Sequence, residues 1–524
     1  MTGTASLVRL ILRRDRIRLP IWVLALVGIV YASVGAVSET YSSPEQIQGY
    51  ASTMGTSPAA IAMAGPPVAL DTVGGIAVNE TGITALVGTA LMAIFLVVRH
   101  TRTEEETGRT EMLRATVLGR HAPLAAALLV VSGASVLVGA GVAASVATLD
   151  VPTGGVLVYG VAVAVFGILF ACVAAVAAQL TAHGRGAIGI SLVVLAVAFL
   201  LRAVGDVRDN ALSWLSPMGW SQQVEAFGDL RWWPLGLSAV FAALTVVAAV
   251  ALATRRDLGS GIVPARPGPP EAAAALGTPV GLAWRLQRGS ILGWAVGIFI
   301  GAAAFGSFSR EVQSMVESNP ELAEFFAQAG GASLVDSFLS SALLIMNLVG
   351  AGFAVSSALR LRSEETSGRL EPVLATGVSR SRWLLSGALV TMAGCVLVVA
   401  AGGLGVGLAH GIVSDDLGVV VDLLGYSLLY LPALLALAGL AVLLFGWAPR
   451  FGAAAWAAVA VCFLIGYFGE LLGFPSWFKS ISPFTHTPAA PVDAVTVAPL
   501  ATITLVVVLA AALGLVGFRR RDIG

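Results

Sequence analysis

Two stretches of the chain combine acidic and basic side chains at a spacing that brings them together on a helix. RTEEETGRTEMLRATVLGR covers residues 102–120, and RSEETSGRLEPVLATGVSR covers residues 362–380. Glu105 and Arg109 are four residues apart, so their side chains can pair along one helical face. Such pairs alone stabilise a solvated helix by only about 0.2–0.5 kcal/mol each. The chemistry of these stretches is therefore ion pairing, either within the helix or with a partner protein.

The two stretches, called here the first and second charged segments, are copies of one another. At an offset of 260 residues they align without a gap and share nine of nineteen residues. A loop that only had to be soluble would not need the same charged residues at the same positions in both copies. The repetition favours docking of two equivalent helices onto a two-fold symmetric partner, with charge complementarity setting the register. The candidate docking residues are Arg102, Glu104, Glu105, Arg109 and Glu111, and Arg362, Glu364, Glu365, Arg369 and Glu371.

The sequence carries no motif for catalysis. A nucleotide-binding P-loop needs a lysine after a glycine-rich turn, but the single lysine, Lys479, stands in Trp-Phe-Lys-Ser. The three cysteines lie in apolar stretches and the five histidines show no ligand spacing. We therefore expect no metal and no cofactor bound by this chain. If ATP drives the protein, another polypeptide hydrolyses it.

The rest of the chain is apolar enough to fill a membrane. Its 524 residues are 57% hydrophobic and 11% charged, with a mean hydropathy of +0.89. Apolar runs of about 18 residues or more predict membrane-spanning helices, because lipid offers no hydrogen-bond partner for a bare backbone. Twelve runs occur, near residues 19–37, 81–99, 122–148, 156–179, 187–204, 234–254, 291–308, 339–359, 383–410, 419–446, 453–469 and 499–518. The sequence predicts an all-α integral membrane protein with twelve transmembrane helices.

The basic residues are distributed unevenly between the two sides of these spans. With both termini on one side, 25 of the 30 Lys and Arg residues lie on that side. The positive-inside rule makes that side cytoplasmic. Both termini and both charged segments are therefore expected on the cytoplasmic side of a bacterial cell membrane.

The internal repeat extends beyond the charged segments. Trp22 matches Trp294, and the Arg-Arg-Asp sequence at 255–257 matches the one at 520–522. The expected divisions are a first six-span half at 1–257, a cytoplasmic Pro/Gly/Ala-rich linker at 258–280 and a second six-span half at 281–524. Because six is even, both halves have the same topology, as in transporters built from parallel repeats.

Shorter segments are expected in each half besides the spans. A basic amphipathic segment precedes the first span, at 6–19 and 282–290, and either lies along the inner surface or serves as a topology anchor. A Trp- and Pro-containing segment follows the fifth span, at 211–234 and 474–499. It suits short helices dipping into the outer leaflet, or an interfacial aromatic loop. The outer segment 310–331 has helical character.

These motifs resemble those of a known family. The two charged segments, LPALLALAGLAVLLFGWAPR at 431–450 and the Arg-Arg-Asp ends are similar to the fused twelve-span permeases of actinobacterial ABC-type exporters, the tetronasin-resistance or polyketide-antibiotic multidrug efflux group. The resemblance covers essentially the whole chain, and it extends more distantly to six-span ABC-2 permeases. It implies an ABC-2, or type V exporter-like, arrangement of two parallel six-helix repeats.

The resemblance also implies a function and partners. Each charged segment would contain a coupling helix touching a separate ATP-binding subunit, a homodimer that binds ATP and Mg. The copies differ at Met112 against Pro372, so the two dockings need not be equivalent. Hydrophobic or amphiphilic cargo, such as antibiotics, drugs or lipids, would leave the cytoplasm or inner leaflet through a cavity between the halves. The expected partners are those subunits, membrane lipids and the cargo, with no nucleic acid.

Five residues on the second and fifth spans are candidates for lining that cavity, and ordinary helix or lipid packing is the alternative for each. They are Phe95, Met346, Asn347, Phe463 and Tyr467.

Two other functions are compatible with the sequence. An ion-coupled secondary multidrug antiporter usually keeps ionisable side chains deep in the membrane. The spans here are almost free of them, and Arg202, Asp422 and Glu470 stand near the outer ends. A non-transport membrane scaffold that recruits an ATPase would usually carry a large outer domain, and the longest outer loop, 38–80, is short.

Overall fold

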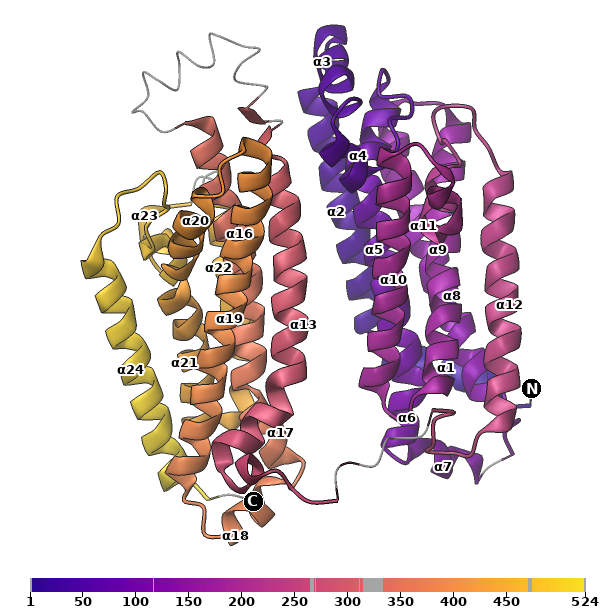
Figure 1. The fold of residues 1–524 in the computed structure, drawn as a ribbon. Coiled ribbons are helices and arrows are strands. Elements are labelled where there is room, and N and C mark those ends of the chain that lie inside the picture. The colour runs from indigo at the N-terminus through magenta and orange to yellow at the C-terminus, as the bar shows by residue number, and fades with distance from the viewer. Residues whose placement is uncertain are drawn as a thin grey trace. The chain divides into compact units, whose positions relative to one another are not determined.

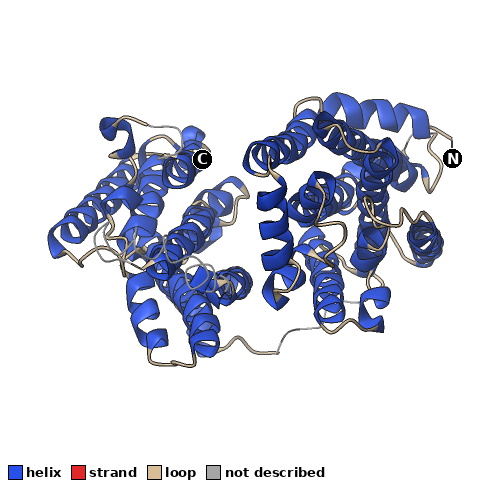
Figure 2. Cartoon of the chain, turned by 90° about the horizontal axis from the view of Figure 1, so that it is seen from above, coloured by secondary structure: helices blue, strands red, loops and turns tan. Residues whose placement is uncertain are grey.

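The structure is a computed structural model that describes most of the chain. The described residues are 2–115, 117–263, 268, 270–310, 312–313, 333–469 and 474–522. All regular elements within these ranges are helices (Figure 2). Most of the outer segment 310–331, and residues 264–267 and 269 of the expected linker, lie outside them. The chain forms two compact units, Met1–Gly268 and Pro269–Gly524, and each is described by itself.

The prediction of an all-α membrane protein with twelve spans is confirmed within the described residues. Six helices or helix pairs of the first unit are long and apolar enough to cross a membrane: Arg18–Thr40, Val73–Glu106, Ala122–Leu149, Thr153–Leu180, Gly184–Val207 and Trp233–Arg255. The six of the second unit are Pro279–Ser307, Leu334–Thr366, Arg380–Ser414, Val419–Trp447, Pro449–Tyr467 and Val497–Arg520.

The long α-helices of the first unit follow one another in up-and-down order, with short helices at the ends (Figure 1). Together, these helices are α1 (Thr4–Arg14), α2 (Arg18–Thr40), α3 (Pro44–Met54), α4 (Pro58–Ala64), α5 (Val73–His100), α6 (Arg102–Glu106), α7 (Arg109–Arg114), α8 (Ala122–Val146), α9 (Thr153–Leu180), α10 (Gly184–Val207), α11 (Pro217–Gln222) and α12 (Trp233–Arg255). Two 3₁₀ turns, η1 (Ala147–Leu149) and η2 (Ala211–Leu215), complete the unit.

The second unit repeats this plan with local differences. Its α-helices are α13 (Pro279–Ser307), α16 (Leu334–Ala358), α17 (Arg360–Thr366), α18 (Leu370–Ala375), α19 (Arg380–Ser414), α20 (Val419–Leu428), α21 (Leu431–Trp447), α22 (Ala454–Phe468), α23 (Ser476–Lys479) and α24 (Val497–Arg520). Its 3₁₀ turns are η3 (Ala274–Gly277), η4 (Pro449–Phe451) and η5 (Pro483–His486). The fourth span is broken into α20 and α21, because Pro432 at the start of α21 cannot donate a helical hydrogen bond.

Small residues let the spans of each unit approach closely. A Cβ added at Gly139 of α8 would lie 2.3 Å from the carbonyl oxygen of Gly160 on α9. A Cβ added at Gly446 of α21 would lie 2.1 Å from the carbonyl oxygen of Gly514 on α24. Close backbone approach is the usual way in which helices pack in a bilayer, where burial from water contributes little. It positions the last span of the second unit firmly against the fourth.

The two ends of each unit differ in composition. One end, called here the arginine-rich end, carries α1, α6 and α7 in the first unit and α17 and α18 in the second (Figure 1). The opposite end of the first unit carries α3, α4 and the short helices η2 and α11. Short helices also form after the fifth span of the second unit, as α23 and η5. The buried Ser216 and Ser482 cap α11 and η5, each followed by the proline that opens the helix.

The two basic amphipathic segments take different structures, although the sequence predicts the same one for both. In the first unit the segment forms the separate helix α1, and three residues divide it from α2. In the second unit it is continuous with the first span as the start of α13, so of the two alternatives for 282–290 the separate surface helix is wrong. Pro20 explains the difference, since it would fall inside a continuous helix, whereas the repeat places Leu292 there.

Candidate functional site

Each charged segment folds as two short helices joined at a glycine. α6 and α7 meet at Gly108, whose φ is 70°, and α17 and α18 meet at Gly368, whose φ is 68°. These left-handed values favour glycine strongly over other residues. The glycine that the repeat aligns in both copies is therefore a turn residue. Pro372 falls in the first turn of α18, where its missing N–H is tolerated.

Glu105 anchors the first charged segment to the end of the last span. Its two carboxylate oxygens accept hydrogen bonds from Arg256, which follows α12, at 2.6 Å and 2.8 Å. The side chains of Glu105 and Arg256 are each only 9% exposed. Arg102 also donates to Glu105, and its Nε donates to the Thr181 carbonyl at 2.6 Å. The pair is bidentate and charge-assisted, the strongest kind of side-chain hydrogen bonding.

Glu365 anchors the second charged segment in the same way. Its two oxygens accept hydrogen bonds from Arg521, which follows α24, each at 2.6 Å. The Arg521 guanidinium also lies over the ring of Phe445, 4.8 Å from its centroid, and over that of Phe518 at 5.2 Å. The repeat aligns Glu105 with Glu365 and Arg256 with Arg521, so both units use the same ion pair.

A second contact joins each charged segment to its last span. Arg120 donates to the Thr254 carbonyl at 2.9 Å, close to the carboxyl end of α12. Arg380 donates to the Arg521 carbonyl at 2.7 Å, just beyond α24. The carbonyls at a helix end have no intrahelical partner, and a cation there also interacts favourably with the helix dipole. Each charged segment is thus attached to its last span near both of its ends.

Glu104 and Glu364 occupy matching positions, and each lies near the arginine five residues on, 3.6 Å from Arg109 in the case of Glu104, but Glu104 also has a second partner. Glu104 is buried and pairs with Arg14 of α1 at 2.8 Å. The hydrogen bond with Glu104 raises the pKa of Arg14. Glu364 pairs with Arg369, five residues on in its own segment, at 2.9 Å. The Arg14–Glu104 pair therefore links the first charged segment to the separate helix α1.

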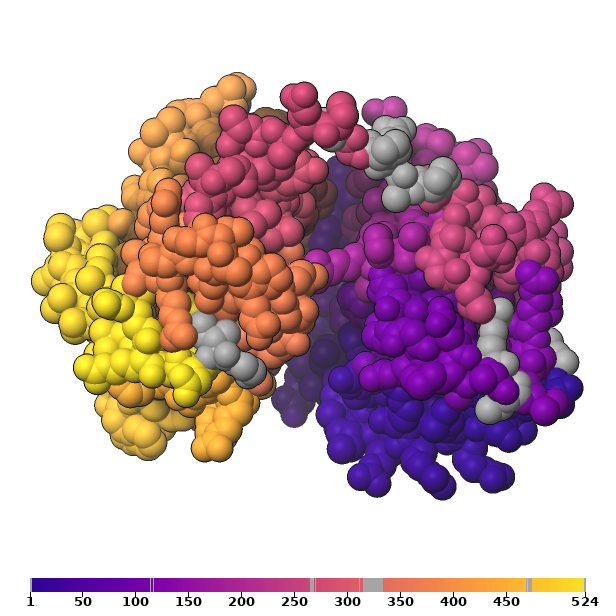
Figure 3. All heavy atoms as spheres, turned by 90° about the horizontal axis from the view of Figure 1, so that it is seen from below, coloured from indigo at the N-terminus to yellow at the C-terminus, as the bar shows by residue number. Residues whose placement is uncertain are grey.

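The ten candidate docking residues divide into anchoring and exposed groups. Arg102, Glu104, Glu105, Glu364 and Glu365 are engaged within their own unit, and Arg362 is half-buried beside Gly452. Arg109, Glu111, Arg369 and Glu371 are exposed. The Arg109 and Arg369 side chains are 52% and 59% exposed, and Met112, on the same helix as Arg109, is 68% exposed. Viewed from the arginine-rich end, each segment lies on the surface of its own unit (Figure 3).

Sequence reasoning missed the arginines that hold these segments. Arg14, Arg120, Arg256, Arg380 and Arg521 were not among the candidate site residues. The sequence did contain a signal for some of these arginines. The repeat aligns Arg120 with Arg380, and it aligns the Arg-Arg-Asp sequence at 255–257 with the one at 520–522. Their partners are remote in sequence, so the pattern alone does not pair them.

The five candidate cavity residues lie in different environments. Asn347 is buried, and its Nδ2 donates to the Leu343 carbonyl at 2.8 Å and to Ser427 Oγ at 3.1 Å. Met346 is buried next to it on α16. Phe95 is partly exposed and stacks on Trp22. Phe463 and Tyr467 are partly exposed and stack on each other along α22, with ring centroids 5.8 Å apart.

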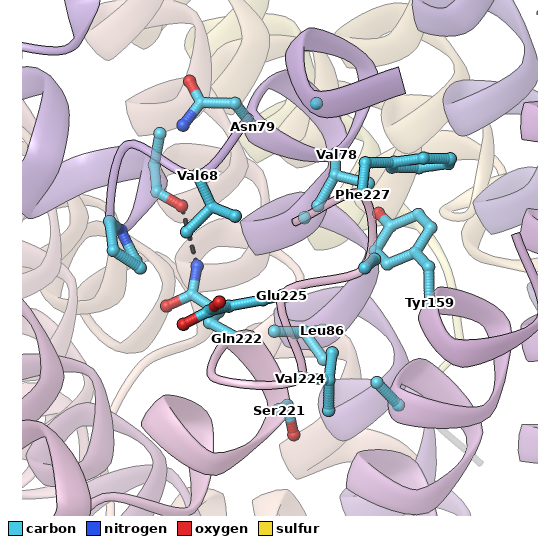
Figure 4. A pocket seen from close by; sticks show the side chains of 16 residues that line it. Val68, Val78, Asn79, Leu86, Tyr159, Ser221, Gln222, Val224, Glu225 and Phe227 are labelled. Atoms are coloured by element: carbon cyan, nitrogen blue, oxygen red, sulfur yellow. Dashed lines mark hydrogen bonds between the residues drawn. The ribbon is translucent and has the colours of Figure 1, made fainter. Parts of the chain in front are cut away.

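A small pocket lies at the opposite end of the first unit (Figure 4). Asn79 of α5, Tyr159 of α9, and Gln222 and Glu225 near α11 contribute to its wall. Gln222 Nε2 donates to the Ala64 carbonyl at 2.7 Å across one side. The cavity volume is about 40 Å³, enough for a few water molecules. It is too small for a drug-sized molecule.

A larger apolar groove lies in the second unit between α21, α22 and α24, and reaches η5. Its volume is about 800 Å³, within the range of drug-binding pockets. The wall is lined by Ala436, Leu437, Leu440, Ala458, Val461, Cys462, Ile481, Pro483, His486, Ala498, Pro499, Thr502, Ile503 and Val506. The lining contains no Asp, Glu, Lys or Arg. Across the described residues, no cluster of His, Cys, Asp and Glu could hold a metal ion.

Comparison with known proteins shows the family to which the chain is similar. The family model described as "Multidrug efflux system permease Rv1217c, C-terminal domain" matches residues 5–253 and again residues 276–519. A curated relative, the "Multidrug efflux system permease protein Rv1217c" of Mycobacterium tuberculosis, is 39% identical over 525 residues. The alignment covers 100% of this chain and 95% of the relative.

Proposed function

This chain belongs to the family of multidrug efflux system permeases, and from that membership we propose that it is the membrane subunit of an ATP-driven exporter. Two copies of a separate ATP-binding subunit dock on the exposed parts of the two charged segments. The energy of ATP binding and hydrolysis reaches the spans through those segments. The cargo is a hydrophobic or amphiphilic compound.

The main support for this proposal is that the two charged segments have matching structures. Each turns at a left-handed glycine, presents an exposed arginine and an exposed glutamate at matching positions, and is fixed to its last span by a largely buried Glu–Arg pair. A surface that transmits force must be rigid relative to the element it moves. Anchoring at Glu105 and Glu365 supplies that rigidity, and Arg109, Glu111, Arg369 and Glu371 remain available for a partner.

The anchors define which spans a docked partner would move. α6 continues directly from α5, so the second span moves with the first charged segment. The ion pair with Arg256 links the same segment to α12, which packs along α9. In the second unit, Arg521 links the segment to α24, which packs along α21. A pull on each segment therefore tilts the second and last spans together.

The sequence and the charge distribution support a separate, cytoplasmic subunit for ATP binding. The single lysine is not part of a P-loop, so ATP and Mg are bound by the partner subunits. The excess of arginine around the charged segments favours a cytoplasmic position for them and for both termini. The partners are cytoplasmic for the same reason.

The apolar groove of the second unit fits cargo of this class. Its volume of about 800 Å³ suits a drug-sized compound, and its uncharged lining suits a neutral one. Replacing Ala458, which lines the groove, with Trp should fill part of this volume and lower drug resistance in cells. Ala457→Trp, at an exposed position of α22 outside the groove, is the matched control and should leave resistance unchanged. Equal resistance of both variants would rule this groove out.

The test of the docking assignment uses the exposed glutamates. The chain is co-expressed with a candidate ATP-binding neighbour, and co-purification and drug-stimulated ATPase activity are measured. The double variant Glu111→Arg/Glu371→Arg places like charges at the expected interface and should weaken assembly at least ten-fold. Glu39→Arg, exposed at the far end of α2, serves as the control and should assemble normally.

Two results would overturn the proposal. One is normal assembly and ATP turnover in the double variant. The other is drug efflux that continues after ATP depletion and collapses with the proton gradient, which is the behaviour of an ion-coupled antiporter.

A further inference from the structure

The break between α1 and α2 creates a corner that the second unit does not repeat in its described residues. α1 buries Leu7 and Ile11 against Ala122, Ala126 and Val130 of α8 and the turn before it. α2 also packs against α8. Because α1 and α2 meet at an angle instead of running on as one helix, the three helices enclose a space between them. In the second unit the corresponding helix, α13, is continuous.

That space is an apolar groove of about 790 Å³. Its apolar lining is Val8, Leu12, Leu19, Pro20, Val23, Leu24, Leu129, Val130, Gly133, Ala134 and Leu137. Leu12, Leu24, Leu129 and Leu137 are all exposed on the outside of the unit, so the groove opens on the unit's outer apolar surface. A Cβ added at Gly133 meets no atom within 4 Å, which makes this glycine the open floor of the groove.

The polar end of the groove is cationic. Arg16 lines it and is exposed. Arg9 and Arg13, one turn apart on α1, are exposed too, each following a lining residue by one position. Within the part of the chain that the structure describes, these three arginines have no ion-pair partner.

Asp15, also at this end, does not offset that charge. It is fully buried, and its Oδ2 lies 2.6 Å from His100 Nε2. Its Oδ1 lies 3.4 Å from Arg99 Nη2. The carboxylate is thus held by contacts inside the protein, and with three exposed arginines against one carboxylate the mouth of the groove keeps a net positive charge.

We propose that this groove binds an anionic phospholipid, with one acyl chain along α8 and the phosphate on Arg16, Arg13 and Arg9. A groove open to the bilayer would lose dispersion contacts if it stayed empty, and a hydrocarbon chain restores them. The arginines stand where α1 meets the membrane surface, at the level of lipid headgroups, and arginine pairs well with phosphate. The second-unit groove has the same volume but no charged lining residue, so it lacks this preference.

The bound lipid also supports the first charged segment. Arg14, next to Asp15 at the corner, holds Glu104 at 2.8 Å. A lipid that fixes α1 against α8 therefore fixes the partner of Glu104. Among the ion pairs of the described residues, Glu364 pairs with Arg369 in its own segment and with Arg360 two residues before it, and not with α13.

The experiment measures lipid binding to the purified full-length chain without any partner subunit. Native mass spectrometry compares phosphatidylglycerol with phosphatidylcholine, and thermal unfolding in each lipid gives a second readout. The wild type should retain phosphatidylglycerol preferentially and be stabilised by it. Arg16→Gln should bind phosphatidylglycerol roughly five-fold more weakly, the effect expected for one arginine near an anionic headgroup. Gly133→Leu, which fills the floor, should lose binding of both lipids.

Two controls separate the site from general effects. Arg208→Gln removes an exposed arginine at the opposite end, and Gly28→Leu fills open space beside α2 outside the groove. Both should bind phosphatidylglycerol as the wild type does. Wild-type binding by Arg16→Gln and Gly133→Leu would overturn the proposal. Displacement of the bound lipid by an efflux substrate would also overturn it, because the groove would then be a cargo site. Neither outcome depends on ATP-driven export.

Discussion

The structure gives Glu105 and Glu365 a different role from the one that the sequence predicts. On a helix drawn from the sequence, both point to solvent and are available to another protein. In the structure, each forms a bidentate pair with an arginine at the end of the last span, and the glutamate side chains are 9% and 10% exposed. Removing Arg256 leaves Glu105 with Arg102 alone, and removing Glu105 leaves both arginines without their carboxylate. Breaking such a largely buried pair costs more than the pair itself contributes.

Substitution of this pair gives a prediction at the residue scale. Glu105→Gln and Arg256→Gln should each lower the free energy of unfolding by about 2–4 kcal/mol. The double variant should be less destabilised than the sum, with a coupling above about 1 kcal/mol. Denaturant titration of the purified protein measures both quantities. Glu111→Gln, at an exposed position, should change stability by less than about 0.5 kcal/mol. Strictly additive effects would show that the pair does not hold the segment.

The charged segments are hairpins of two short helices, and their shape depends on one residue each. Gly108 and Gly368 stand alone in the left-handed region between the two helices, and an added Cβ at either meets no atom within 4 Å. Packing therefore does not explain the glycine; backbone conformation does. A side chain here costs roughly 1–2 kcal/mol through its own backbone.

Alanine at these turns gives a prediction at the element scale. Gly108→Ala should destabilise the first charged segment by about 1 kcal/mol and weaken partner binding by roughly five-fold. Amide hydrogen exchange over residues 102–115 and a binding titration measure the two effects. Gly289→Ala, in the open interior of α13, should be neutral or stabilising by up to about 1 kcal/mol, because its backbone is helical. Identical behaviour of the two variants would contradict this account of the turn.

The first unit adds a second element-scale feature, the corner between α1 and α2. The buried Asp15 pairs there with His100. The repeat places Gln287 at this position, and its Oε1 accepts a hydrogen bond from Ser357, which contacts Thr391. An ion pair in the first unit is thus replaced by hydrogen bonds between uncharged side chains in the second unit. The repeat preserves the fold of the units but not their chemistry.

At the scale of the whole molecule, the two units are separate folding cores joined by a short linker. One hydrophobic cluster gathers α2, α5, α8 and α9, and another gathers α13, α16, α19 and α21. Each unit has an even number of spans, so the linker begins and ends on the same side. The positive-inside rule then predicts the same orientation for both units.

Cysteine labelling gives a prediction at this scale. The native Cys172, Cys395 and Cys462 are buried, so an impermeant maleimide should leave the wild type unlabelled. Met112→Cys and Trp477→Cys introduce thiols at positions where the native side chains are 68% and 69% exposed. Right-side-out vesicles should label only the second variant, and inside-out vesicles only the first. Labelling of both from one side would contradict the proposed orientation.

The sequence by itself determined the features that depend on local order. Hydropathy predicted twelve spans, because each must be apolar along its own length whatever its neighbours. The repeat predicted two equivalent charged segments, and the family comparison agrees that the chain is a multidrug efflux permease.

The tertiary structure decided which charges are available to a partner. Glu105 and Arg256 are 151 residues apart, and Glu365 and Arg521 are 156 apart. No local pattern links such residues, so the sequence could not separate anchors from the exposed Arg109, Glu111, Arg369 and Glu371. The groove beside α1 also depends on the tertiary structure. Pro20 predicts a break in the helix, but only the packing of α1 and α2 on α8 turns that break into a groove.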